Sequence, residues 1–132
     1  MAIDVIVCGA AGRMGKILVS LVQENSEARL VGAVEAAKHW ALGKDAGEVA
    51  GIGPIGVSIT NDYGALATSE TVTLDFTLPE AALAHLRIAA ATGAAIAIGT
   101  TGFSAEQRAE AAQLAPKTRT LIAPNMSVGV NV

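Results

Sequence analysis

The chain has 132 residues, the size of one domain, and its composition, 52% apolar but only 3% aromatic, suits a parallel sheet covered by alanine-rich helices. A formal net charge of −3 without a basic run argues against a nucleic-acid partner or a membrane surface. No apolar stretch is long enough to span a membrane and no charged leader precedes one, so we expect a soluble, cytoplasmic protein. The single cysteine, Cys8, excludes an internal disulfide and is expected to be a buried, unreactive thiol.

The first expected strand, residues 3–8, leads into the glycine-rich stretch GAAGRMG at residues 9–15, after which apolar residues recur at helical spacing. A helix begins with backbone N–H groups that have no partner, and glycines let a phosphate approach them closely. The stretch departs from the usual G-x-G-x-x-G pattern, because the first position of that pattern, counted back from Gly15, is Ala10. A tight turn without a ligand is the alternative interpretation.

The second expected strand, residues 30–34, ends in Glu35, which follows Gly15 by 20 residues. In βαβ dinucleotide-binding folds, an acidic residue at about this distance accepts hydrogen bonds from the adenosine ribose. Glu35 and the glycine-rich stretch together therefore predict a dinucleotide site. A solvated charge at a strand end is the alternative.

After one irregular segment, the chain alternates between strands and helices. Residues 36–61 are rich in glycine and are expected to be a loop, with a short strand near residues 57–59 and a short helix beginning near Asp62. Further strands are expected at residues 71–76, 94–99 and 119–123, and further helices at residues 77–92 and 104–115.

Both later helices carry start signals. Thr77 with Glu80, and Ser104 with Gln107, have the spacing of a capping box, in which two side chains satisfy the first N–H groups of a helix. Gly93 is expected to end the first of these helices.

This order of elements predicts an α/β fold of the Rossmann type: a doubly wound, mostly parallel sheet with helices on both faces, occupying residues 1–132 as one domain. Ligands of such folds bind beyond the carboxyl ends of the strands. The polar clusters of this sequence all follow expected strands, so a site is expected at that edge.

Two of these clusters, GTTG at residues 99–102 and APNMS at residues 123–127, offer backbone N–H groups, hydroxyls and an amide. Such groups suit the carboxamide and ribose of a nicotinamide, which needs both donors and acceptors to orient its ring. Ordinary turns are the alternative interpretation of each cluster.

The stretches VCGAAGRMG, DFTLPE, GTTGF and APNMSVGVNV, in this order and spacing, resemble the N-terminal domain of the dihydrodipicolinate reductases, the 4-hydroxy-tetrahydrodipicolinate reductases of lysine biosynthesis. The resemblance covers residues 3–132. It implies an oxidoreductase that uses NAD(P)H in the diaminopimelate route to lysine, a route of amino-acid biosynthesis.

The resemblance also implies roles for individual residues. Residues near the pyrophosphate would be Gly9, Ala10, Ala11, Gly12, Arg13 and Met14; Glu35 would hold the adenosine ribose; residues at the nicotinamide half would be Gly99, Thr100, Thr101, Ala123, Pro124, Asn125 and Met126. Thr101 would also face the substrate. No catalytic residue and no metal ligand is expected in this chain.

The expected cofactor is NADH, NADPH or both, with NADH favoured. Members of the family often carry a basic residue directly after the ribose-binding acid, where it can meet a 2′-phosphate, but here that position is Ala36. Lys38 and Arg13 are the other cations that could take this role.

The family's substrate motif, which is rich in histidine and contains a lysine and a PSGT-like loop, is not in this sequence. We therefore expect the chain to be inactive alone, and the whole protein to be a homotetramer that acts on a cyclic dicarboxylate. His39 and His85 are expected at the surface or at the adenine edge, not in catalysis. An aspartate- or homoserine-type dehydrogenase and a non-catalytic dinucleotide-sensing module remain the alternative functions.

Overall fold

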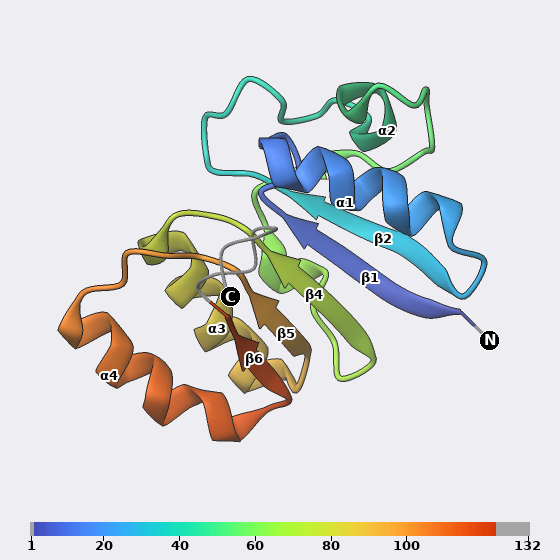
Figure 1. Cartoon of the computed structure of the whole chain (residues 1–132). Coiled ribbons are helices and arrows are strands. Elements are labelled where there is room, and N and C mark those ends of the chain that lie inside the picture. Colours follow the sequence, from blue (N-terminus) through green and yellow to red (C-terminus); the bar gives the residue numbers. More distant parts are fainter. Residues whose placement is uncertain (1, 124–132) are drawn as a thin grey trace, which may run out of the picture.

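A computed structural model describes residues 2–123 and contains one six-stranded parallel sheet in the order β3-β2-β1-β4-β5-β6 (Figure 1). The strands are β1 (Ile3–Cys8), β2 (Ala28–Val34), β3 (Ile59–Thr60), β4 (Thr71–Asp75), β5 (Ala95–Ile98) and β6 (Thr120–Ile122). The helices are α1 (Arg13–Glu24), α2 (Ala46–Ala50), α3 (Pro79–Thr92) and α4 (Ala105–Leu114), with 3-10 turns η1 (Tyr63–Ala65) and η2 (Ala115–Lys117). The predicted doubly wound Rossmann-type fold is confirmed.

Alternation along the central strand builds a core on each face of the sheet. Val5 and Val7 of β1 pack into one cluster with apolar residues of α1 and α2, whereas Ile6 and Cys8 pack into the other with residues of α3, α4 and η1. Figure 1 shows α1 and α2 gathered beside β1 and β2, and α3 and α4 beside β5 and β6. From β1, the strands β2 and β3 are added toward one edge of the sheet, and β4, β5 and β6 toward the other. Folds of this class bind their ligands at the point between β1 and β4 where this order reverses.

The start of α3 differs from the prediction. Leu78, not Thr77, is the N-cap residue, and no side chain caps the helix. The Thr77 hydroxyl instead donates a hydrogen bond to Asp75 Oδ1 at 2.6 Å, which draws it away from the helix. The predicted capping box of Thr77 and Glu80 is therefore wrong. The other predicted box is confirmed, since Ser104 and Gln107 bond reciprocally at the start of α4.

Residues 36–61 hold more regular structure than predicted. They include the five-residue helix α2, whose N-cap is Asp45. The Asp45 carboxylate accepts hydrogen bonds from the backbone N–H groups of Gly47, Glu48, Ile55 and Gly56, which ties this glycine-rich segment together. The expected short strand lies at β3, and the expected short helix near Asp62 is the 3-10 turn η1, which Asp62 caps.

Within residues 2–123, no helix has the length and apolar character needed to cross a membrane.

Candidate dinucleotide-binding site

The glycine loop between β1 and α1 is shaped by two glycines that the fold itself requires. Gly9 has φ of +84°, and a Cβ there would come within 2.8 Å of the Phe76 carbonyl oxygen. A Cβ on Gly15 would overlap the backbone of Gly9 and Ala10, so the first turn of α1 packs directly on the end of β1. Neither glycine therefore needs a ligand to explain it.

Gly12 is different, because packing within the protein restricts this position less. Its φ is −77°, and a Cβ at this position would meet only the Gly9 carbonyl oxygen, at 3.3 Å. Gly12 is also the N-cap of α1, where no side chain caps the helix and no acidic residue lies in the first turn. The N–H groups of Arg13, Met14 and Gly15 are thus left for an anion that can approach over a residue without a side chain.

Glu35 lies against this loop, as its spacing predicts. Its Oε2 accepts a hydrogen bond from the Ala11 N–H at 2.8 Å, and its side chain is only 10% exposed. Its Oε1 lies 3.3 Å from the Ala36 nitrogen and 3.8 Å from His39 Nε2. The glycine loop therefore orients the carboxylate through Oε2, while Oε1 lies near the Ala36 N–H and the His39 imidazole.

A pocket of about 630 Å³ lies beside Glu35, at the ends of β1, β2 and β4. Its lining is mainly apolar and consists of Gly9, Gly12, Glu35, Ala36, Ala37, His39, Asn61, Phe76, Thr77, Leu78, Ala81, Ala84 and His85. One wall is the turn after β2, and the opposite wall is the start of α3. The pocket lies where the strand order reverses, between β1 and β4, and its walls are mainly apolar. Both features suit an adenosine group.

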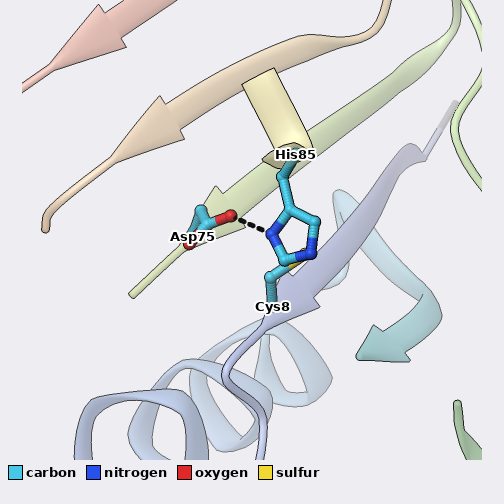
Figure 2. Close-up of side chains that lie close together, drawn as sticks. All are labelled: Cys8, Asp75 and His85. Atoms are coloured by element: carbon cyan, nitrogen blue, oxygen red, sulfur yellow. Dashed lines mark hydrogen bonds and ion pairs between the residues drawn. The ribbon is translucent and has the colours of Figure 1, made fainter. Parts of the chain in front are cut away.

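A buried polar pair lies next to this pocket. Asp75, at the end of β4, is fully buried, and its Oδ2 lies 2.6 Å from His85 Nδ1 on α3. Figure 2 shows the two side chains pointing toward one another, with Cys8 close to the imidazole. An ionised carboxylate only accepts hydrogen bonds, so we assign Nδ1–H of His85 as the donor. His85 thus lies at the pocket, as expected, but with a fixed orientation that the sequence did not indicate.

The donor atoms of Cys8, Asp75 and His85 lie within 4.8 Å of one another, a set of ligands that zinc accepts. However, burial and the nearby charges of Asp75 and Glu35 raise the pKa of the Cys8 thiol well above its usual range. Asp75 Oδ2 and His85 Nδ1 are already hydrogen-bonded to one another, and a metal ion would have to replace that bond. The cluster therefore favours a hydrogen-bonded pair beside a neutral thiol over a metal centre.

The groups predicted for the nicotinamide half serve the fold more than the site. Gly99 is required by the Phe76 ring, which a Cβ would overlap. The Thr100 hydroxyl donates to the Thr77 carbonyl oxygen at 2.8 Å, and Thr100 is only 4% exposed. Thr101 is exposed, and the Ala123 N–H continues the pairing of β6 with β5. Pro124, Asn125 and Met126 lie outside the described residues.

The sequence matches the model of the family described as the N-terminus of dihydrodipicolinate reductase, over residues 3–126. The chain belongs to this family. It is 47% identical over 130 residues to the 4-hydroxy-tetrahydrodipicolinate reductase of Citrifermentans bemidjiense and 45% identical over 130 residues to that of Geobacter metallireducens. These matches cover 98% of this chain but 49% and 48% of the relatives, so the chain spans about half their length.

One solved structure agrees with the family assignment, and a second agrees with the fold. A dipicolinate-bound dihydrodipicolinate reductase from Paenisporosarcina sp. TG-14 superposes with a TM-score of 0.70 at 25% identity, covering 98% of this chain and 49% of that one. An amine dehydrogenase from Mycobacterium smegmatis has a TM-score of 0.71 at 22% identity, covering 92% of this chain and 38% of the other. At that identity, the second match shows the fold alone.

Of the residues in the α3 wall of the pocket, the sequence analysis identifies only His85. Leu78, Ala81, Ala84 and His85 all line the pocket. Their spacing places them on one helical face, and small residues at two of these positions leave room for a flat ring. That pattern was available in the sequence, but it is equally typical of a helix packed on a sheet.

Proposed function

We propose that this chain is the dinucleotide-binding domain of a 4-hydroxy-tetrahydrodipicolinate reductase, which uses NAD(P)H to form tetrahydrodipicolinate in lysine biosynthesis through diaminopimelate. The observation that carries the proposal is the hydrogen bond of Glu35 to the glycine loop at the mouth of an apolar pocket, in a chain of this family. Its relatives bear that enzyme name, and one is bound to dipicolinate, a cyclic dicarboxylate.

The residues present fit the two phosphates and the adenosine of a dinucleotide. Gly12 leaves space for the pyrophosphate above the first N–H groups of α1, with the exposed Arg13 beside it. Glu35 accepts hydrogen bonds from the adenosine ribose, and the apolar pocket takes the adenine. The nicotinamide half then extends toward residues 99–101 and Ala123.

The reduced nicotinamide supplies the hydride of the reaction, and residues of this chain bind and orient it. The cyclic substrate carries two carboxylates, which need cationic partners. Among the residues predicted for the nicotinamide half, the exposed polar side chain that the structure describes is that of Thr101, which is neutral. We therefore assign the substrate anchors and the proton donor to a further domain of the whole protein, which would be a cytoplasmic homotetramer.

The first experiment is a calorimetric titration of this chain with NADH and NADPH, together with assay of the whole protein for NADH oxidation on addition of 4-hydroxy-tetrahydrodipicolinate. We expect this chain to bind NADH without turnover, and the whole protein to catalyse the reduction. If neither dinucleotide bound, the assignment of the pocket would be wrong.

Ala36 favours NADH over NADPH in this proposal, because a 2′-phosphate would lie beside Glu35 without an adjacent guanidinium. Replacing Ala36 by Arg is expected to shift preference toward NADPH by about 1–2 kcal/mol, the scale of a charge-assisted hydrogen bond. Ala109→Arg, on the exposed part of α4, adds the same charge away from the pocket and is the control. A strong NADPH preference of the unchanged chain would contradict the assignment and point to Lys38 or Arg13.

A further inference from the structure

We propose that His39 recognises the 2′-hydroxyl of the adenosine ribose together with Glu35, by donating a hydrogen bond from Nε2 to the oxygen whose proton Glu35 accepts. This inference rests on the proposed function, because it concerns the same dinucleotide. It adds a specificity-determining residue that neither the glycine loop nor the ribose-binding acid supplies.

The tautomer of His39 follows from its local contacts. Its Nδ1 accepts a hydrogen bond from the Ala41 backbone N–H at 3.0 Å, so Nδ1 carries no proton. The ring proton of the neutral imidazole is therefore on Nε2. Nε2 lies 3.8 Å from Glu35 Oε1, and both residues line the pocket.

The pair has the chemistry of a hydroxyl receptor. At 3.8 Å, the Nε2–H donor and the Oε1 acceptor are too far apart for a good hydrogen bond, but one oxygen atom can lie within hydrogen-bond distance of both. A hydroxyl can donate to Oε1 and accept from Nε2 at once. A phosphate dianion has no proton for the carboxylate and is repelled by it, so the pair selects the 2′-hydroxyl of NADH.

The turn after β2 holds the imidazole in this place. Two backbone hydrogen bonds fix the turn on either side of His39. The His39 N–H donates to the Ala36 carbonyl, and the Leu42 N–H donates to the His39 carbonyl. Lys38, with φ of +69°, has a left-handed conformation that lysine rarely adopts. Such a conformation persists only where surrounding contacts fix it, which indicates a turn of defined shape.

Two substitutions separate the proposed hydrogen bond from the shape of the turn. His39→Asn places an amide oxygen near the Nδ1 position, where it can still accept from the Ala41 N–H, but removes the Nε2 donor. His39→Gln retains an N–H donor near the Nε2 position and loses the acceptor for Ala41. Each variant is titrated with NADH and with the analogue of NADH that lacks the 2′-hydroxyl of the adenosine ribose.

The readout is the ratio of the two dissociation constants, analogue over NADH. We expect His39→Asn to lower this ratio about three- to tenfold, the scale of one hydrogen bond. The variant should bind NADH more weakly and bind the analogue with the same affinity as the parent chain. His39→Gln should retain most of the ratio. Thermal unfolding of both variants checks that the domain is folded.

An unchanged ratio in His39→Asn, with NADH still bound by the parent chain, would overturn the role of His39 and leave the proposed function intact. An equal loss in both variants would also overturn it, since the shape of the turn would then be responsible. Failure of the parent chain to bind NADH or NADPH would overturn the proposed function, and the role of His39 with it.

Discussion

At the ends of β1, β2 and β4, three residues predicted to bind a dinucleotide, Gly9, Gly12 and Glu35, line a pocket. At the ends of β5 and β6, most of the predicted groups that the structure describes bond within the fold instead. Glu35 lines this pocket, and its Oε2 accepts a hydrogen bond from the Ala11 N–H. Thr100, chosen for the nicotinamide half, has its hydroxyl on the Thr77 carbonyl and is buried.

The difference reflects the kind of information in each signal. Glu35 was identified by its distance from the glycines, and that distance is a property of a whole βαβ unit. Thr100 was identified from its residue type at a strand end, where a hydroxyl can equally bind a neighbouring carbonyl group. A spacing that spans two elements therefore led to a residue that lines the pocket, whereas a cluster of suitable side chains led to a residue buried in the fold.

The largest expected effect separates the two kinds of glycine in the loop. Gly15→Val would force a side chain into the backbone of Gly9 and Ala10, so α1 could not keep its position on β1. We expect the free energy of unfolding to fall by about 3 kcal/mol or more, measured by urea denaturation. A variant of unchanged stability would mean that this contact does not hold the loop.

Gly12→Val is expected to affect the ligand instead. The new Cβ would contact only the Gly9 carbonyl, but its methyl groups would occupy the space above the start of α1. NADH binding should weaken at least tenfold, about 1.4 kcal/mol, while the free energy of unfolding changes by less than about 1 kcal/mol. Gly64→Val, an exposed position away from the pocket, is the control. If NADH bound Gly12→Val with unchanged affinity, the assignment of the pyrophosphate to this loop would be wrong.

Next to the pocket, the hydroxyls of Tyr63 and Thr73 form a hydrogen bond of 2.7 Å, and the Tyr63 ring packs edge-on against His85, which lines the pocket. Burial raises the pKa of Tyr63 to about 12, from an ordinary value of 10.0, and the hydrogen bond to Thr73 opposes this only in part. Between these values the unfolded chain loses the phenolic proton and the folded chain keeps it, so stability present below pH 10 is lost as the pH rises.

We expect that loss to be about 2 kcal/mol between pH 10 and 12, in unfolding experiments compared with Tyr63→Phe. The phenylalanine variant cannot ionise and should lack this part of the pH dependence. If the free energy of unfolding varied with pH in the same way in both proteins, Tyr63 would be accessible to water in the folded chain.

Asp75 explains much of what the sequence left undetermined. It was treated as part of an apolar strand, although a carboxylate inside a buried strand needs partners. Its partners are His85, ten residues later on α3, and Thr77. Because Asp75 binds Thr77, the predicted capping box does not form. A contact between a strand end and the next helix depends on how the helix packs, which local sequence does not specify.

The fold itself was largely predictable, because hydrophobic runs and punctuating glycines act locally. All six strands overlap their predicted ranges, although β3 does so only at Ile59, the last residue of the range expected for it. The exception was α2: five residues in a glycine-rich segment carry almost no periodic signal. Asp45 organises that segment through bonds to residues up to 11 positions away, which a local pattern cannot reveal.

The smallest expected effect tests the nicotinamide side directly, by the same exchange at neighbouring threonines. Thr100→Val removes the hydroxyl that satisfies the Thr77 carbonyl and should lower the free energy of unfolding by about 1 kcal/mol. Thr101→Val changes an exposed residue and should leave stability within about 0.5 kcal/mol.

Ligand binding should show the opposite pattern for the two threonines. Thr101→Val is expected to weaken NADH binding about two- to fivefold, because the exposed Thr101 hydroxyl can reach the nicotinamide half. Thr100→Val should weaken NADH binding less. ADP-ribose lacks the nicotinamide and should bind both variants like the parent chain, which separates this half of the site from the adenosine half. The opposite result would be weaker NADH binding in Thr100→Val than in Thr101→Val at equal stability. It would mean that the buried Thr100 hydroxyl leaves the Thr77 carbonyl when NADH binds. The contrast between the ends of β1, β2 and β4 and the ends of β5 and β6 would then hold only for the unbound protein.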